Sequence, residues 1–299
     1  MKRLAALLLA AAVLPAAPVQ ARDLGDALRG LKDKLERPEQ RSAPQQQAAP
    51  RPAQDSVSLP AIPPIGNVPE GDEIKIGRYI AGNLLGAAPL VEDAALQGYV
   101  NRVGRWVAAQ SERPGLPWTF GVIESSDVNA FAAPGGYVFV TRGLYALLRD
   151  EAELAGVLAH EVGHVIQKHH LKVMQKSQLI GAGGDLLARR LGSKDDRVKG
   201  LIGSGAEIMA RGLDKDAEFE ADRIGVVLAT RAGYDSYGLP AVLQEIGHLS
   251  ADSGAVALLF KTHPHPDERL ARLGEAMGAR FDGVADGKSL PERLQKAKK

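Results

Sequence analysis

One stretch decides the fold of this sequence, and it reads Leu158-Ala159-His160-Glu161-Val162-Gly163-His164-Val165. It holds the pattern H-E-x-x-H within a run of helical periodicity, and residues four apart on a helix lie one turn above each other. His160 and His164 can therefore direct two imidazole rings at one point. Two imidazoles suit Zn²⁺, which in catalytic sites takes three protein ligands and leaves the fourth position to water. Glu161 lies beside that point, where it can take a proton from such a water.

A second predicted helix, at 214–232, carries the residues that would complete such a site. Chance alone can place two histidines and a glutamate on one helix, so a third ligand is the feature to seek. Glu218 and Asp222 are four apart and share a face. Glu218 is the candidate third ligand, and Asp222 is the candidate acceptor for the outward N–H of a ligand ring, with His160 favoured as its partner. Glu220 points off this face and is interpreted as a solvated carboxylate; the alternative for the whole stretch is a charged helix surface.

The other histidines and one arginine have several interpretations. His169 and His170 follow the motif, and at 100° per residue they rotate away from the ligand face, so we predict that they are not ligands. His263 lies in a predicted loop between a threonine and a proline, where a histidine is usually at the surface, and His265 is expected to be exposed. Arg269 either forms a structural ion pair or binds a carboxylate or a developing oxyanion.

Hydrophobic periodicity predicts the elements around the motif. Asp150 with Glu153 three positions later resembles a capping box, which marks the start of the motif helix. Residues 171–212 predict a glycine-interrupted helical segment that either covers the site or touches a membrane. The other expected helices lie at 74–86, 93–109, 143–148, 214–232, 238–248 and 266–278, and the expected strands at 119–123, 129–132 and 137–141.

The composition is that of a globular chain of one or two domains. Of 299 residues, 45% are hydrophobic and 24% are charged. The net charge of +1 offers no electrostatic case for nucleic acid, so no such partner is expected. The sequence has no cysteine, which excludes disulfides and a lipid-modified cysteine.

The first 68 residues differ from the rest of the sequence. Residues 1–21 have a basic start, an apolar run and small residues before Ala21, which predicts a cleaved signal peptide. An uncleaved membrane anchor is the alternative. Residues 22–68 are rich in proline and glutamine and predict a disordered linker. Export together with the lack of cysteine favours a bacterial periplasm, with membrane association left open. Residues 69–299 are expected to form the domain that contains the motif.

Taken together, these motifs resemble the zinc metallopeptidase family M48, of the HtpX, OMA and BepA type. The resemblance covers about residues 70–280 and extends to the periplasmic branch, here without that branch's repeat domain. It rests on His160-Glu161-Val162-Gly163-His164, on Glu218 to Asp222, on Asn129-Ala130-Phe131, on Gly135-Gly136-Tyr137-Val138, and on Thr262-His263-Pro264 followed by Arg269.

The resemblance implies an α+β fold of the gluzincin type, a zincin that is mostly helical with a small antiparallel sheet beside the H-E-x-x-H helix. It implies one Zn²⁺ per chain, held by His160, His164 and Glu218, with Glu161 as the catalytic residue.

Two further roles follow from the same resemblance. An edge strand of the sheet would hold the substrate in extended form, and here that role would fall on Gly136, Tyr137 and Val138. His263 would reach the zinc and hold the enzyme latent, or assist the transition state, with Arg269 as a second candidate for assistance.

The expected function is that of an exported zinc endopeptidase. It would cleave unfolded or misassembled envelope polypeptides in outer-membrane protein quality control, with the outer-membrane assembly machinery as an expected partner. One alternative is a latent chaperone or binding protein with a peptidase fold, kept shut by His263 and residues 171–212. Another is a domain that zinc stabilises without catalysis, which would unfold on chelation.

Overall fold

The computed structural model describes residues 68–176, 213–250, 253–278, 281 and 287–298. The predicted signal peptide, the predicted linker up to residue 67 and residues 177–212 lie outside the described residues. The described helices are α2 (Glu70–Ala87), α3 (Ala94–Ala108), α4 (Arg142–Leu147), α5 (Glu151–Ile166), α8 (Lys215–Arg231), α9 (Gly238–Gly247), the 3-10 helix η2 (Gly254–Val256), α10 (Ala257–Thr262), α11 (Pro266–Met277) and α12 (Pro291–Ala297). None of these helices is long and apolar enough to cross a membrane.

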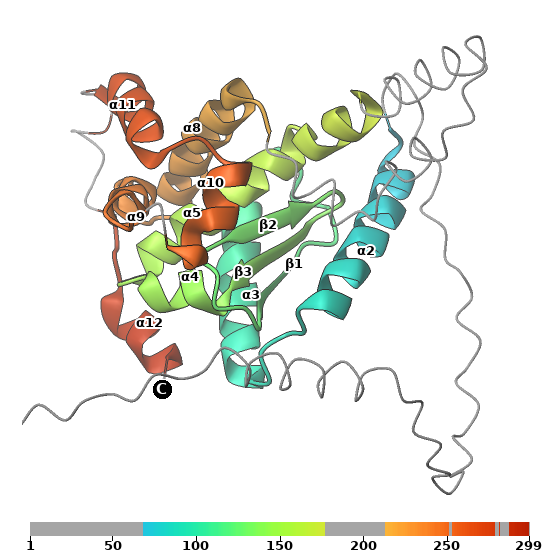
Figure 1. Ribbon diagram of the computed structural model, residues 1–299, viewed down its shortest axis with the longest axis horizontal. Coiled ribbons are helices and arrows are strands. Elements are labelled where there is room, and N and C mark those ends of the chain that lie inside the picture. The colour runs from blue at the N-terminus through green and yellow to red at the C-terminus, as the bar shows by residue number, and fades with distance from the viewer. Residues whose placement is uncertain (1–67, 177–212, 251–252, 279–280, 282–286, 299) are drawn as a thin grey trace, which may run out of the picture. The chain divides into compact units, whose positions relative to one another are not determined.

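One small sheet lies among these helices (Figure 1). Its strands β1 (Thr119–Ile123), β2 (Ala130–Ala133) and β3 (Tyr137–Thr141) have the order β1-β3-β2. β2 and β3 are antiparallel, joined by a turn in which Gly135 and Gly136 adopt φ angles of 75° and 100° that glycine accepts without strain. β1 is parallel to β3, so the sheet is mixed where an antiparallel one was expected. The expected mostly helical α+β class is confirmed.

The sheet order corrects one expectation about the substrate strand. The strand that follows Gly136 is β3, which pairs with β1 on one side and with β2 on the other. Gly136, Tyr137 and Val138 therefore begin the central strand and cannot offer a free edge. The reason is tertiary: β3 inserts between β1 and β2, and nothing within β3 itself encodes the pairing with β1.

The outer edge of β1 is occupied by side chains from α3. Gln97 accepts a hydrogen bond from the Val122 N–H at 2.9 Å and donates to the Val122 carbonyl at 2.8 Å. Asn101 accepts from the Phe120 N–H at 3.0 Å. These amides replace a fourth strand, so β2 is left as the edge of the sheet that borders α5.

Of the described helices α5 is the most buried, and every residue from Glu151 to Val165 is buried. Asp150 caps it by accepting from the Glu153 N–H at 2.8 Å. The Glu153 carboxylate reaches one residue further back than in a capping box and accepts from the Arg149 N–H at 2.6 Å. The predicted start of the motif helix is thus confirmed.

A buried carboxylate joins distant parts of the chain to the start of α5. Glu151 is fully buried and accepts from the hydroxyls of Tyr99 at 2.8 Å and Tyr234 at 2.9 Å. Arg293 of α12 lies 2.9 Å from the same carboxylate. Three partners satisfy a charge that would otherwise be costly to bury, and they explain why α12 forms although its sequence has little hydrophobic pattern.

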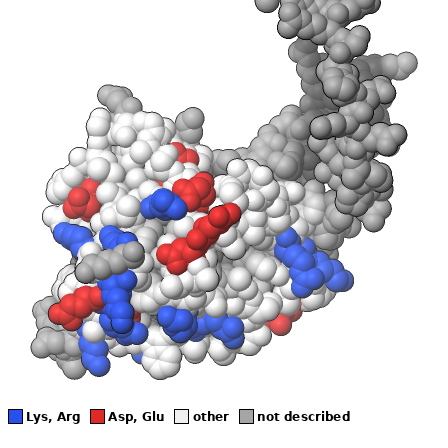
Figure 2. Space-filling model, turned by 90° about the horizontal axis from the view of Figure 1, so that it is seen from below, with Lys and Arg blue, Asp and Glu red and all other residues white. Residues whose placement is uncertain are grey.

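Charged side chains of both signs are mixed on the face drawn in Figure 2. Two ion pairs of the exposed surface, Arg142–Glu124 and Lys215–Glu268, both measure 2.7 Å. Exposed pairs of this kind contribute about 0–1 kcal/mol each, so the fold depends mainly on its apolar core.

Candidate metal centre

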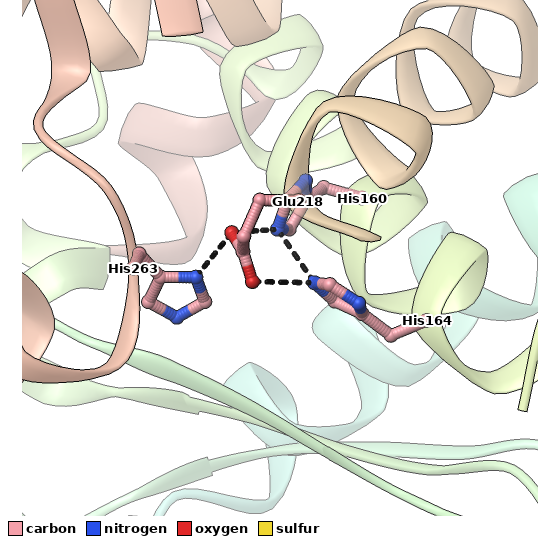
Figure 3. Close-up of side chains that lie close together, drawn as sticks. All are labelled: His160, His164, Glu218 and His263. Atoms are coloured by element: carbon pink, nitrogen blue, oxygen red, sulfur yellow. Dashed lines mark hydrogen bonds and ion pairs between the residues drawn. The ribbon is translucent and has the colours of Figure 1, made fainter. Parts of the chain in front are cut away.

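Four side chains from three parts of the chain converge on one point (Figure 3). α5 contributes His160 and His164, α8 contributes Glu218, and His263 directly follows α10. One ligating atom from each lies within 4.8 Å of those of the other three. The Nε2 atoms of His160 and His164 are 3.0 Å apart, and Glu218 Oε2 lies 3.7 Å from His160 Nε2. The spacing of four residues on α5 therefore directs both rings toward the carboxylate on α8.

The cluster has the donors that a divalent metal requires. Glu218 Oε1 is buried and has no hydrogen-bond partner among the described residues, although it lies 3.4 Å from His164 Nε2. Burial lowers the pKa of His164, so its ring is neutral and keeps a lone pair for a metal. Burial alone would raise the pKa of Glu218, but His263 and His164 outweigh burial and keep that pKa well below its ordinary value. A metal held here would satisfy the unpaired carboxylate oxygen.

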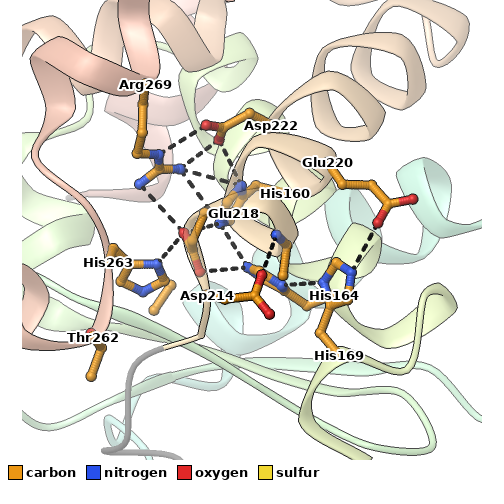
Figure 4. Close-up of polar contacts among 12 residues, drawn as sticks. His160, His164, His169, Asp214, Glu218, Glu220, Asp222, Thr262, His263 and Arg269 are labelled. Carbon is orange, nitrogen blue, oxygen red and sulfur yellow. Dashed lines mark hydrogen bonds and ion pairs between the residues drawn. The ribbon is translucent and has the colours of Figure 1, made fainter. Parts of the chain in front are cut away.

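Asp222 and Arg269 support His160 from behind (Figure 4). Asp222 Oδ1 lies 2.9 Å from His160 Nδ1, which leaves the Nε2 atom facing the cluster. Arg269 donates from Nε to Asp222 Oδ2 at 2.9 Å. Burial alone would raise the pKa of Asp222, but the guanidinium of Arg269 outweighs it and keeps the carboxyl ionised. Arg269 therefore forms an ion pair with Asp222, and its Nη1 atom also lies 4.0 Å from Glu218.

Glu161 is buried at the junction of two cavities. Its side chain borders both, together with Ala130 of β2 and His263. Burial raises the pKa of Glu161, and the nearby His160 opposes that rise without cancelling it. A carboxyl group whose pKa lies closer to neutrality exchanges a proton more readily near pH 7.

The two cavities differ in chemistry. The polar cavity has a volume of about 20 Å³ and is lined by Ala130, Phe131, Glu161, His164, His170, Leu213, Glu218, Thr262 and His263. The apolar cavity has a volume of about 40 Å³ and is lined by Ala130, Leu144, Val157, His160, Glu161, Leu239, Val242, Leu243, Ile246, Leu259, His263 and Arg269. Glu161 and His263, which line both cavities, therefore lie between a polar wall and a mainly aliphatic wall.

The edge strand beside the metal centre is β2. The Thr141 N–H donates to the Asn129 carbonyl at 3.0 Å, which sets the alternation of the antiparallel pair. Ala130 and Ala132 consequently direct their main-chain groups away from β3. The Ala130 N–H is taken by the Asn129 side chain at 2.9 Å. Of the two strands, β2 and not β3 lies at the edge of the sheet.

His169 and His170 do not rotate away from the site as expected. α5 ends at Ile166, and Lys168 has a φ of 57°, so the helix is interrupted by a turn before a second helical run begins at His169. His169 Nδ1 consequently lies 2.9 Å from His164 Nδ1, and the ring of His170 lies 5.7 Å from that of His164. Neither belongs to the four-residue cluster found among the described residues. Only the geometric premise was wrong, because it extended α5 beyond Ile166, where the helix ends.

Two other expected surface residues have defined partners. Glu220, interpreted as a solvated carboxylate, is 41% exposed in its side chain and lies 3.2 Å from His169 Nε2. His265 is exposed as expected, with 51% of its side chain accessible, and accepts weakly from the Asp267 N–H at the start of α11.

Comparison with known proteins places this geometry in a family. Residues 94–277, more than half of the chain, match the family described as Peptidase family M48. The chain is 32% identical over 209 residues to the beta-barrel assembly-enhancing protease of Escherichia coli (strain K12), which covers 67% of this chain and 43% of that protein. It is 33% identical over 176 residues to metalloprotease YcaL of the same strain, which covers 58% of this chain and 65% of YcaL.

A mitochondrial protein is also similar. The chain is 30% identical over 188 residues to the mitochondrial metalloendopeptidase OMA1 of Arabidopsis thaliana, which covers 62% of this chain and 37% of OMA1. The chain thus spans less than half the length of the beta-barrel assembly-enhancing protease and of OMA1. Since the family match includes the intact cluster of His160, His164 and Glu218, the chain belongs to peptidase family M48.

Proposed function

We propose that this chain is a zinc endopeptidase with one zinc ion per chain, held by His160, His164 and Glu218. The observation that carries the proposal is the position of Glu161, which is buried and lines the same cavity as His164, Glu218 and Ala130 of β2. A zinc ion bound there would supply an acidified water and a polarised scissile carbonyl. Glu161 would accept the proton of the attacking water and donate it to the leaving amine.

The proposed substrates are extended polypeptides. Ala130 and Ala132 on the edge of β2 can pair with the main chain of a peptide, and such pairing recognises backbone more than side chains. Only an unfolded or misassembled protein presents a backbone segment in this way. The likeness to a beta-barrel assembly-enhancing protease supports an envelope substrate, and outer-membrane assembly machinery as a partner. Residues 1–21 would direct export to the periplasm, and residues 69–299 would form the peptidase domain.

The apolar cavity adds a preference for one substrate side chain. Most of its wall consists of aliphatic residues from α4, α5, α9 and α10, and His160, Glu161, His263 and Arg269 complete it. A volume of about 40 Å³ corresponds to roughly three water molecules, which matches a branched aliphatic side chain. We therefore expect cleavage next to residues such as leucine or valine, and poor cleavage where a charged residue would enter the cavity.

His263 would close the site in its resting state. Its Nδ1 lies 2.6 Å from Glu218 Oε2, and it is the fourth member of the donor cluster. Four protein ligands leave no position for a reacting water. The same observation favours a second candidate function, a binding protein or chaperone whose peptidase centre stays shut. The two candidates differ in whether removal of His263 releases proteolysis.

The test compares three chains loaded with zinc: the wild type, Glu161→Gln and His263→Ala. Each would be incubated with an unfolded protein, and zinc content would be measured alongside cleavage. We expect chelator-sensitive cleavage by the wild type, none by Glu161→Gln at unchanged zinc content, and faster cleavage by His263→Ala. Cleavage that survives Glu161→Gln would exclude the proposed role of Glu161. Bound zinc without cleavage by any chain would favour the closed binding protein.

A further inference from the structure

We propose that His169 and Glu220 form a hydrogen-bonded relay behind His164 that orients this ligand ring and strengthens metal binding. Both are positioning residues, since neither belongs to the ligand cluster. The inference deepens the proposed function, because it rests on a metal bound by His164. It concerns the affinity of the site and can fail while the peptidase assignment stands.

The contacts behind His164 form an unbroken chain (Figure 4). His164 Nδ1 lies 2.9 Å from His169 Nδ1, and His169 Nε2 lies 3.2 Å from Glu220 Oε2. The rings of the two histidines meet edge to face, with centroids 5.2 Å apart. The side chain of His169 is only 3% exposed, so both of its nitrogens are used inside the protein.

The chemistry of the metal site fixes the direction of each hydrogen bond. His164 Nε2 faces Glu218 and would carry the lone pair for the metal, so the Nδ1 of the neutral ring carries the proton. That N–H donates to the bare Nδ1 of His169, whose proton is then on Nε2 and donates to Glu220. Every donor meets an acceptor, and the relay ends on an anion. A ligand imidazole that donates to such a chain is held in orientation and made more basic.

The relay connects His164 to a carboxylate on α8 through the ring of His169. Asp222 reaches His160 directly, at 2.9 Å from Nδ1. Glu220, two residues earlier on α8, faces another direction and reaches His169 instead. The imidazole of His169 spans the gap, so each histidine ligand has a carboxylate behind it, one in direct contact and one through a second ring.

The turn that delivers His169 is held from a distant part of the chain. Lys168, in the left-handed region, donates to the Val68 carbonyl at 3.2 Å and lies 3.5 Å from Glu73. Glu73 is fully buried and is anchored by Arg113 at 2.9 Å. The start of α2 therefore holds the turn after α5 that places His169 against His164.

The test measures zinc affinity of the full chain by competition with a chelator. His169→Leu removes the acceptor and keeps the bulk, and we expect zinc to bind about 10- to 100-fold more weakly. His169→Asn keeps an amide oxygen able to accept from His164, and we expect it to recover most of that loss. Glu220→Ala lies at a partly exposed position, so it should fold normally and weaken binding by a smaller factor. Cobalt-substituted His169→Leu should also show an altered visible spectrum, which reports on ligand geometry.

The matched control is His170→Leu. It removes the neighbouring imidazole, whose Nδ1 has no hydrogen-bond partner among the described residues, and we expect zinc affinity close to wild type. Unchanged affinity in both His169→Leu and Glu220→Ala would overturn the relay. So would equal losses in His169→Leu, His169→Asn and His170→Leu, since these would indicate packing alone. Cleavage by the wild type and its loss in Glu161→Gln are read separately, so neither result depends on the relay.

Discussion

Glu218 illustrates how much a single side chain decides in this site. One carboxylate oxygen accepts from His263 at 2.6 Å, and the other is buried without a hydrogen-bond partner among the described residues. A buried polar atom left unsatisfied costs about 1–3 kcal/mol. A metal ion bound at this point would satisfy that oxygen.

A residue-scale prediction concerns the apolar cavity, which Leu259 lines. Leu259→Ala enlarges the cavity, so we expect the ratio of cleavage next to phenylalanine over leucine to rise by about tenfold, the usual effect of pocket size on specificity. Mass spectrometry of the fragments of an unfolded protein would give the residues that flank each cleaved bond. Both the shift and its direction can be checked in one digest.

The control for this prediction is Leu96→Ala. Leu96 has the same exposed fraction as Leu259, 8%, but lies on α3 outside the cavity. Each substitution should lower the free energy of unfolding by about 2–5 kcal/mol, and only the first should change the cleavage profile. Identical cleavage profiles in the two variants would show that the cavity does not determine specificity.

At the scale of elements, the crossing of α5 and α8 sets the geometry of the ligands. A Cβ atom at Gly225 would lie 3.0 Å from the His160 main-chain nitrogen, and one at Gly163 would lie 3.2 Å from the Ala221 Cα. Small residues thus let the two backbones approach closely. Because α5 supplies two ligands and α8 the third, the separation of these helices determines how well three donors fit one ion.

We predict that Gly225→Ala weakens zinc binding by about tenfold. The added methyl group pushes on the backbone of α5, and overpacking of this kind costs about 1–3 kcal/mol. The control is Gly82→Ala, at an exposed position of α2, where a Cβ would meet no atom within 4 Å. That change should leave zinc affinity unaltered and stabilise the protein by about 0.4–1 kcal/mol. Equal zinc affinities in the two variants would contradict the role of the crossing.

At the scale of the whole molecule, the core consists of apolar side chains from most of the described elements. The largest cluster of buried hydrophobic residues draws on α3, the sheet, α5, α8, α9 and α12. Glu151 and its three partners tie the same elements together at the opposite end of α5 from the ligands. A catalytic metal site on such a scaffold differs from a zinc-stabilised fold, in which the ion replaces a missing core.

We therefore predict that chelation abolishes activity without unfolding the chain. The metal-free protein should keep its helical circular dichroism and a cooperative thermal transition. Its unfolding temperature should fall, because zinc present at 100 times its dissociation constant stabilises the folded state by about 2.7 kcal/mol. Collapse of the helical signal on chelation would instead support the alternative of a structural zinc domain.

Features that depend on near neighbours in the chain were determined by the sequence. Strands 119–123 and 137–141, the cap at Asp150 and the joint orientation of His160 and His164 follow from side-chain alternation, capping and the helical repeat. The short helices α10 and α12 were not predicted, because helices of six or seven residues are marginal alone and form here through tertiary contacts.

Only the tertiary structure decided which strand is the edge and which histidines meet. β3 lies between β1 and β2, and the turn at Lys168 is held by Glu73 from another helix. A left-handed φ at a lysine has no local signal, so extending α5 by its own periodicity sent His169 to the wrong side. The H-E-x-x-H motif determined the two histidines of the cluster, and contacts between distant segments determined which side chains lie behind these two rings.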